Sequence, residues 1–483
     1  MKWTRVLVAV LVAVAAAVAL RALSGGTAKS ESARRALVAA DAISPENLAE
    51  IVLDRDGVRA RFVRRGESWW QVEPIEHAVD SWSMRQFASR LLACEVVREI
   101  DLSRDESGAA RDAASREALA RDAGLSPAVA RIELVERAPS EGVAPRRVAL
   151  ELGRRSLAGR AYARVAGGDE SRVAVVDAAL HEFALERDLR EFRRREVFVD
   201  LAEVDAVEFT SGANRIELVR EGRGYRLESP VRTRADRAAA EEFVDALRRA
   251  KSGGFVTDSP AEPVVYGLAP PAATLAVRSG AETRRLLVGD TVSIGAQDRF
   301  GMLEGSTTVV RLPAATLATI LPRAERLVDG VASGVRAADI GGIEIAWRGS
   351  DERLSLRREV KGWTGRLARQ GVAESTVVPV SAEAVDRLIA ALTATRAGTI
   401  ELAQLPPERV AATITLLGFA DEPIDTVRVA QLEPRAGDAG SGPRTALENG
   451  DGVLRVHGSI DLPLTAAELR GEGAQAGQAP RQR

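Results

Sequence analysis

Three related stretches decide the fold, and the first of them is Leu48-Ala49-Glu50-Ile51-Val52-Leu53. The pattern returns as Val204-Asp205-Ala206-Val207-Glu208-Phe209 and again as Ile340-Gly341-Gly342-Ile343-Glu344-Ile345, with apolar residues at the first, fourth and sixth places. Self-similarity at such a spacing is the mark of a repeated structural unit. The sequence therefore predicts three copies of one unit.

Two further strand patterns follow each of these stretches. The second strands are Val58-Arg59-Ala60-Arg61-Phe62, Arg215-Ile216-Glu217-Leu218-Val219 and Arg353-Leu354-Ser355-Leu356-Arg357. Alternation with a period of two predicts half-buried antiparallel strands. The third strand carries an aromatic residue in every copy: Trp69 and Trp70, Tyr225, and Trp363. Each unit is therefore expected to begin with a three-stranded meander.

A helix with a shared register follows each meander. Its predicted N-caps are Asp80, Asp236 and Ser381, whose side-chain oxygens can accept hydrogen bonds from free N–H groups of the first turn. Counted from each cap, small or apolar residues recur at positions 4, 7, 8 and 11, which is one face of a helix. These residues are Met84, Phe87, Ala88 and Leu91; Ala240, Phe243, Val244 and Leu247; and Val385, Leu388, Ile389 and Leu392.

A Pro-containing turn and more strands complete each unit, so the predicted fold class is α+β. We expect three tandem repeats, each an antiparallel sheet with a capped amphipathic helix, behind an N-terminal transmembrane helix. The predicted segments are 1–23 for a transmembrane anchor or signal segment, 24–40 for a linker, 41–198, 199–333 and 334–469 for the three repeats, and 470–483 for a disordered tail. Gly289-Asp290 is compatible with a polar site, but a Gly-Asp pair after an apolar strand more often forms a hairpin turn, which we expect here.

The second unit carries a resemblance to a known family. Tyr266-Gly267-Leu268-Ala269-Pro270-Pro271-Ala272-Ala273-Thr274, followed by Leu286-Leu287-Val288-Gly289-Asp290, resembles the family known as domain of unknown function 4340. In the first unit Ala123 replaces the Tyr, and the third unit lacks the Tyr-Gly pair. The resemblance implies bacterial membrane-anchored envelope proteins, often linked to ABC-type export or gliding-motility transporter systems. It brings no established catalytic residues.

The N-terminus has the pattern of a membrane-targeting segment. Lys2 and Arg5 precede an uncharged run of Val, Leu and Ala that ends at Arg21. A spanning helix needs about 20 residues, which this segment supplies if the flanking arginines reach the interfaces. A cleavable signal peptide is the alternative, because Ala17-Val18-Ala19 has the small-x-small form of a cleavage site. We expect a single-pass protein of the bacterial cell membrane with most of the chain outside the cytoplasm.

Composition and the chemically reactive residues argue against several classes. The formal net charge is −2, which gives no basic field for nucleic acid. Cys94 is the only cysteine, so no internal disulfide and no thiolate metal cluster can form, and we expect it to be buried. The histidines, His77 in a loop before a helix, His181 and His457, show no metal-ligand spacing. We therefore predict no catalytic, cofactor-binding or metal site and no enzyme activity.

The aromatic residues are the candidate contacts. Trp69, Trp70 and Trp363 lie in equivalent strands, and alternation directs Trp69 and Trp70 to opposite faces. An exposed Trp can hold a sugar or a partner protein, but packing beneath the helix or against a neighbouring unit is the alternative. The leading hypothesis is a non-catalytic accessory or scaffold component that contacts the ATPase or permease of an ABC-type transporter. The others are a binding module for cell-wall glycan or lipid and, third, an envelope hydrolase using His77 or His181.

Overall fold

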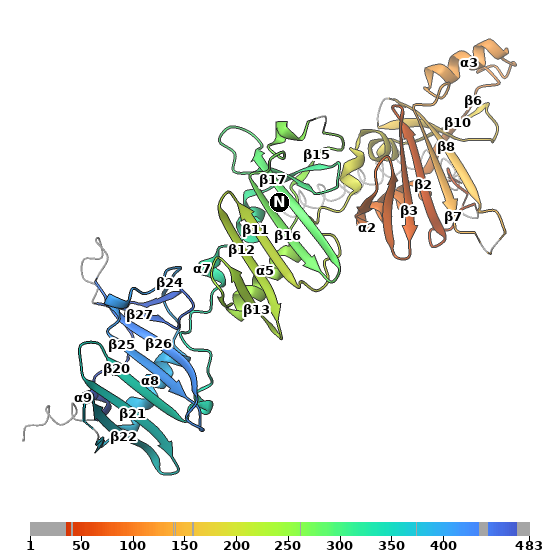
Figure 1. Ribbon diagram of the computed structural model, residues 1–483. Coiled ribbons are helices and arrows are strands. Elements are labelled where there is room, and N and C mark those ends of the chain that lie inside the picture. The colour runs from red at the N-terminus through yellow and green to blue at the C-terminus, as the bar shows by residue number, and fades with distance from the viewer. Residues whose placement is uncertain are drawn as a thin grey trace, which may run out of the picture. The chain divides into compact units, whose positions relative to one another are not determined.

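The computed structural model describes residues 35–470, except 40, 41, 139, 141, 157, 158, 261, 373 and 434–442. The chain divides into two compact units, Met1–Arg194 and Arg195–Arg483. The first unit holds the first predicted repeat, and the second unit holds the other two (Figure 1). Each repeat is built around one antiparallel sheet, so the three predicted copies are present as three sheets.

The first sheet is the largest. Its strands are β1 (Arg35–Ala36), β2 (Leu48–Arg55), β3 (Val58–Arg65), β4 (Ser68–Glu73), β5 (His77–Val79), β6 (Glu95–Asp101), β7 (Ala130–Glu136), β8 (Arg147–Ser156), β9 (Arg160–Val165) and β10 (Arg172–Asp177). They are arranged in the order β1-β6-β10-β9-β8-β7-β2-β3-β4-β5. His77, expected in a loop, lies in β5, where its strand pairs with Gln71 on β4.

The second and third sheets share one topology. The second contains β11 (Ala206–Ser211), β12 (Asn214–Glu221), β13 (Gly224–Ser229), β14 (Thr233–Arg234), β15 (Gly254–Thr257), β16 (Ala273–Ser279), β17 (Glu282–Thr291), β18 (Arg299–Leu303) and β19 (Val309–Leu312). The third contains β20 (Gly342–Trp347), β21 (Glu352–Glu359), β22 (Gly362–Arg369), β23 (Thr376–Val378), β24 (Thr399–Glu401), β25 (Ala412–Leu417), β26 (Pro423–Leu432), β27 (Arg444–Glu448) and β28 (Leu454–His457). Their orders are β14-β13-β12-β11-β16-β17-β18-β19-β15 and β23-β22-β21-β20-β25-β26-β27-β28-β24.

The two halves of every repeat join in a single sheet through the first strand. Ile51 pairs with Leu134, and the matching pairs are Val207 with Val277 and Ile343 with Leu416. The strand after the helix (β6, β15 or β24) crosses to the far side of the sheet and pairs with the last strand of its repeat. The meanders were predicted from the sequence, but this crossing strand was not.

The predicted helices are confirmed together with their caps. The helices are α2 (Ser81–Leu92), α3 (Ala113–Asp122), α4 (Ala179–His181), α5 (Arg237–Arg249), α6 (Ala314–Ile320), α7 (Ala324–Leu327), α8 (Ala382–Thr393) and α9 (Ala466–Arg470), with a π-helix η1 (Glu182–Glu186) and 3-10 helices η2 (Leu189–Phe192), η3 (Pro263–Tyr266), η4 (Ala337–Asp339) and η5 (Pro407–Arg409). Asp80, Asp236 and Ser381 each accept a hydrogen bond from the N–H group three residues later, at 2.7, 2.9 and 3.3 Å. The predicted apolar positions of the three helices are buried, except for Ala88, which is half-buried.

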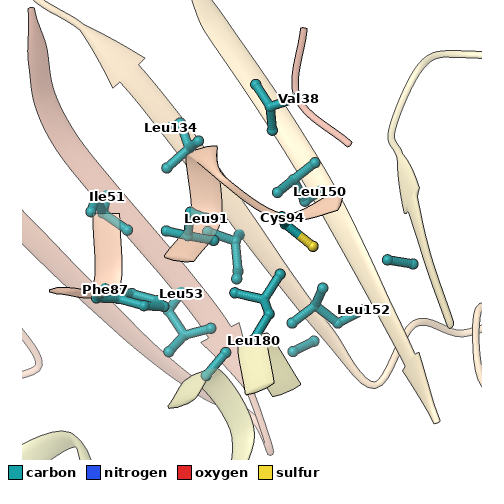
Figure 2. Close-up of a cluster of buried hydrophobic side chains, with 14 of the residues drawn as sticks. Val38, Ile51, Leu53, Phe87, Leu91, Cys94, Leu134, Leu150, Leu152 and Leu180 are labelled. Carbon is teal, nitrogen blue, oxygen red and sulfur yellow. The ribbon is translucent and has the colours of Figure 1, made fainter. Parts of the chain in front are cut away.

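The core of the first repeat lies between α2 and its sheet. Figure 2 shows Phe87 and Leu91 of the helix facing Ile51, Leu53 and Leu134 of the strands. Cys94 is 7% exposed within this cluster, as predicted. Burial, with smaller contributions from the charges of Asp177 and Glu95, raises the pKa of its thiol to about 11.

Two terminal predictions fall largely outside the described residues. The transmembrane helix predicted for 1–23 and the tail from 471 onward lie there. No helix in the described part of the chain is long and apolar enough to span a membrane. The end of the predicted linker belongs to the first repeat, because Arg35–Ala36 pairs with β6 and the N–H of Leu37 donates to the carbonyl oxygen of Cys94 at 2.7 Å.

The hairpin turn predicted at Gly289-Asp290 is wrong. Both residues lie inside β17, and Gly289 is needed there because the backbone of η3 lies against it. A Cβ atom on Gly289 would be 2.0 Å from the carbonyl oxygen of Tyr266. The first repeat has the same arrangement, since a Cβ atom added at Gly153 would be 2.2 Å from the carbonyl oxygen of Ala123. The Tyr-Gly and Gly-Asp motifs are therefore two sides of one close backbone contact.

Candidate functional site

The three predicted tryptophans differ in accessibility. Trp69 is 7% exposed and belongs to the first core cluster, whereas Trp70 is half-buried on the opposite face of β4, with the guanidinium of Arg65 5.3 Å from its ring centre. Trp363 is half-buried against the third core, with Arg358 6.0 Å from its ring centre. Trp69 and Trp70 belong to the first unit and Trp363 to the second. The opposite facing of Trp69 and Trp70 is confirmed, and Trp69 packs beneath the helix.

Trp69 forms part of the floor of a groove beside α2. The groove has a volume of about 570 Å³ and lies between the helix, the β3–β4 hairpin and the segment that precedes β2. Its apolar lining consists of Pro45, Leu48, Trp69, Met84, Ala88, Leu92 and Ala93. Leu92 and Ala88 are only partly buried, so the groove presents apolar surface to the outside.

Charged residues form the rim of this groove. Arg64 is held on the strand side, donating to the carbonyl oxygen of Glu46 at 3.1 Å and to the carboxylate of Glu67 at 3.2 Å. On the helix side, Arg85 is exposed and forms no ion pair with any residue in the described part of the chain. The rim thus offers one cation that is not already neutralised.

Trp82, which the sequence analysis did not single out, is the most exposed tryptophan of the described chain at 59%. It lies in the first turn of α2, three residues before Arg85, so the two side chains are neighbours on the helix surface. The position of Trp82 relative to the cap at Asp80 could have predicted its exposure. Trp82 is the second residue after the cap and falls outside the buried positions 4, 7, 8 and 11.

The second repeat has a groove at the equivalent position, but it is polar. It is about 310 Å³ and is lined by Tyr225, Glu241 and Asp245, among others. Arg248, which replaces Leu92, donates to the carbonyl oxygen of Ala202 at 2.9 Å, and the hydroxyl of Tyr225 donates to the carbonyl oxygen of Val204 at 3.0 Å. These bonds cross the space that is open and apolar beside α2.

The third repeat fills the same place differently. Ile389, which replaces Ala88, is buried, and Thr393, which replaces Leu92, directs its hydroxyl to the carbonyl oxygen of Ile389 at 2.8 Å. Helix α9 adjoins the start of α8, because the N–H of Ser381 donates to the carbonyl oxygen of Leu469 at 2.8 Å. The place beside the capped helix is therefore an apolar groove in the first repeat, a polar groove in the second and filled in the third.

The histidines are buried or lie against backbone carbonyl oxygens. His181 is fully buried, its Nε2 lies 3.0 Å from the carbonyl oxygen of Tyr162, and burial lowers its pKa. His457 is 3% exposed, and burial likewise lowers its pKa. The Nδ1 of His77 lies 2.9 Å from the carbonyl oxygen of Ala78. Among the described residues, no group of three or more His, Cys, Asp or Glu could hold a metal ion.

These features define a tandem α+β repeat protein whose repeats differ in the groove beside the capped helix. The model of the domain of unknown function DUF4340 matches the chain twice, over residues 108–264 and 225–377, which together cover more than half of it. The chain belongs to the DUF4340 family. Each match runs across a boundary between structural repeats, from the later strands of one sheet into the next. No curated protein matches the chain.

Proposed function

We propose that this protein is a membrane-anchored, extracytoplasmic and non-catalytic scaffold that serves as an accessory component of an ABC-type transport system. The family resemblance supplies the link to transport, and the targeting pattern of residues 1–23 supplies the anchor. The structural observation that carries the scaffold role is the groove beside α2. It is an apolar surface that the same fold covers or crosses in its other two copies.

The length of the N-terminal segment supports a site close to the membrane. Residues 24–34 separate the predicted anchor from Arg35, which pairs with β6 in the first sheet. A chain spans at most about 3.3–3.6 Å per residue, so the first repeat would lie within about 40 Å of the bilayer. A groove at that height can meet the extracytoplasmic part of a permease.

The test is a mild-detergent purification of the full-length chain from its own membranes, with mass spectrometry of the bound proteins. Recovery of a transporter ATPase together with its permease is expected. Recovery of the chain alone would contradict the transport role. The permease should bind this chain directly. The ATPase subunits lie on the cytoplasmic side, so they should be lost when the permease is dissociated from this chain.

A binding module for cell-wall glycan or lipid is the second candidate. Trp70 favours it, because this half-buried ring on the sheet face opposite α2 has the Arg65 guanidinium over it and resembles the aromatic surfaces that stack on sugars. A glycan pull-down that depends on Trp70 and not on Trp363 would favour this candidate. If the natural chain and the Trp70→Ala variant are retained equally on the glycan, the glycan-binding candidate is excluded.

A further inference from the structure

The groove beside α2 is elongated along its helix. The lining residues of α2 begin at Ser81, continue through Arg85 and Ser89, and end beyond Leu92 at Ala93. They recur at helical intervals of three and four, so they form one stripe along the whole element. At 1.5 Å per residue this stripe is about 18 Å long, which equals roughly three turns of an opposing helix.

The side chains of the stripe are small where an opposing helix has to approach. Ser81, Ala88, Ser89 and Ala93 leave the helix surface low, while Leu92 and Trp69 supply the apolar contact. Helices pack at 8–10 Å between axes when the side chains at the contact permit it. An acyl chain needs apolar walls on all sides, and here serines and charged rim residues form part of the lining.

The charges of the rim differ between its two sides. Arg64 pairs with the carboxylate of Glu67 and donates to the backbone carbonyl oxygen of Glu46. The Glu46 carboxylate, which also lines the groove, accepts a hydrogen bond from the Ser44 hydroxyl at 2.6 Å, so the side opposite the helix has no cation to spare for an occupant. Arg85 is exposed and unpaired on the helix side, with Trp82 as its neighbour. Tryptophan and arginine are the residue types most enriched among the contacts that dominate protein interfaces.

We propose that the groove between α2 and the β3–β4 hairpin binds an amphipathic helix of a partner protein, with apolar residues on Trp69 and Leu92 and a carboxylate on Arg85. The proposal rests on the proposed function only for where the partner is found, in the extracytoplasmic part of a membrane protein. The recognition itself follows from the helix-in-groove mode, in which residues at i, i+3, i+4 and i+7 enter an apolar groove.

The experiment uses the full-length chain in phosphatidylcholine nanodiscs and two fluorescent synthetic helices of 18 residues. Both peptides carry the same leucine stripe. One has Glu and the other Lys beside that stripe, and binding is measured by fluorescence anisotropy. We expect the Glu peptide to bind about tenfold more tightly than the Lys peptide, because it alone pairs with Arg85.

Three variants test the geometry. Leu92→Arg introduces the residue type that the second repeat has at this place, Arg248, so the fold accepts it. This variant should bind the Glu peptide about tenfold or more weakly than the natural chain does. Arg85→Glu should invert the preference between the peptides. Arg90→Glu is the matched control, because Arg90 is an exposed residue of α2 outside the groove, and it should leave the preference unchanged.

Several outcomes would overturn the proposal. Equal binding of the two peptides to the natural chain would remove the role of Arg85, and unchanged binding by a folded Leu92→Arg chain would remove the groove. A fluorescent fatty acid that binds the natural chain, is lost in Leu92→Arg and is displaced by neither peptide would assign the groove to lipid. Because synthetic helices are the probe, failure here leaves the copurification test of the proposed function intact.

Discussion

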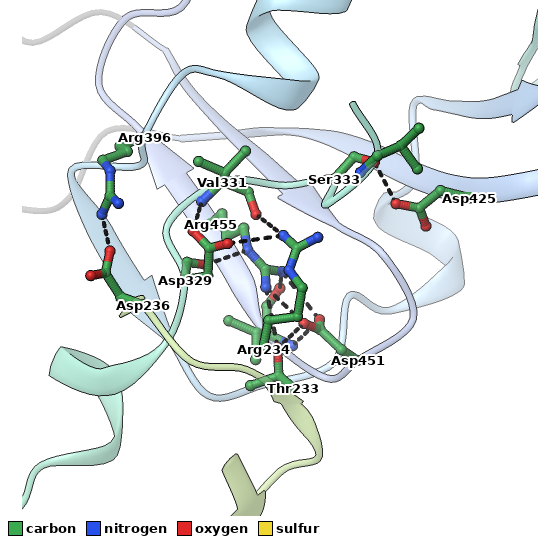
Figure 3. Close-up of polar contacts among 12 residues, drawn as sticks. Thr233, Arg234, Asp236, Asp329, Val331, Ser333, Arg396, Asp425, Asp451 and Arg455 are labelled. Atoms are coloured by element: carbon green, nitrogen blue, oxygen red, sulfur yellow. Dashed lines mark hydrogen bonds and ion pairs between the residues drawn. The ribbon is translucent and has the colours of Figure 1, made fainter. Parts of the chain in front are cut away.

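The guanidinium group of Arg455 on β28 donates a hydrogen bond to the hydroxyl group of Thr233 on β14 at 3.3 Å, which joins the third sheet to the second (Figure 3). The same group, fully buried, donates to the carboxylate of Asp451 at 2.7 Å and to the carbonyl oxygen of Asp329 at 2.9 Å. Val453, two residues before Arg455, packs in the core of the second repeat. The second and third repeats therefore share one buried junction.

We predict that Arg455→Met destabilises the second unit by about 3–5 kcal/mol, because it leaves the carboxylate of Asp451, whose side chain is only 11% exposed, without its cation. Urea unfolding of the full chain, followed by circular dichroism, measures this loss. The control is Arg369→Ala, which removes an exposed ion pair with Glu352 and should cost no more than about 1 kcal/mol. Equal effects of the two substitutions would show that the junction contributes nothing special.

Asp236 gives a second prediction, since it caps α5 and also pairs with Arg396 of the third repeat. Asp236→Ala should cost about 1–3 kcal/mol, and Asp80→Ala, which removes a cap without such a pair, about 1 kcal/mol. The variant Arg396→Ala completes a double-mutant cycle with Asp236→Ala. Strict additivity in urea unfolding would mean that the ion pair does not couple the repeats.

The same carboxylate makes the stability of the second unit depend on pH. Burial alone would raise the pKa of Asp236, but the N–H of Ala239 and the Arg396 guanidinium outweigh it, and the pKa lies below its ordinary value. A depressed folded-state pKa contributes stability that is present above the unfolded value of about 3.9 and is lost as the pH falls through the folded-state value. Stability of the natural chain should fall below about pH 4 more than that of Asp236→Asn.

The sequence predicted those parts of the fold that depend on local pattern. The caps at Asp80 and Asp236 and the apolar face that includes Phe87 were legible because capping and helical spacing act within a few residues. Strand β6 was missed because most of its residues are exposed and more than half are charged, so it shows no alternation. It lies second from the edge of the sheet, with only the two-residue β1 outside it. Its position follows from pairing with β10, which local sequence does not contain.

The candidate site was only partly predictable for the same reason. Trp69 was identified from its place in the repeat, but whether a groove stays open beside it depends on Leu92 and on what lies opposite. In the second repeat Arg248 crosses that space to reach the carbonyl oxygen of Ala202, a backbone atom 46 positions away, and the groove that remains is polar. An alignment of the repeats shows that Arg248 replaces Leu92. Only the tertiary structure shows that this residue borders a groove and changes its surface from apolar to polar.

Cys94 gives a prediction about reactivity. With a pKa of about 11 and 7% exposure, its thiol is a thiolate in about one part per thousand at pH 8. Labelling by Ellman's reagent in the folded chain should therefore be at least about 100-fold slower than in guanidinium chloride. Cys94→Ala should keep the fold. Rapid labelling of the folded chain would mean that α2 separates from its sheet.

Gly289 tests the backbone contact that joins the two family motifs. A Cβ atom at this position would be 2.0 Å from the carbonyl oxygen of Tyr266, and backbone on both sides cannot move away as a side chain can. Gly289→Ala should therefore destabilise the second unit by about 1–3 kcal/mol or more, measured by urea unfolding. Gly224→Ala is the matched control, because Gly224 lies in β13 of the same sheet, has no left-handed backbone and has nothing within 4 Å of its added Cβ. A loss for Gly289→Ala within about 0.5 kcal/mol of this control would mean that η3 is not held against β17.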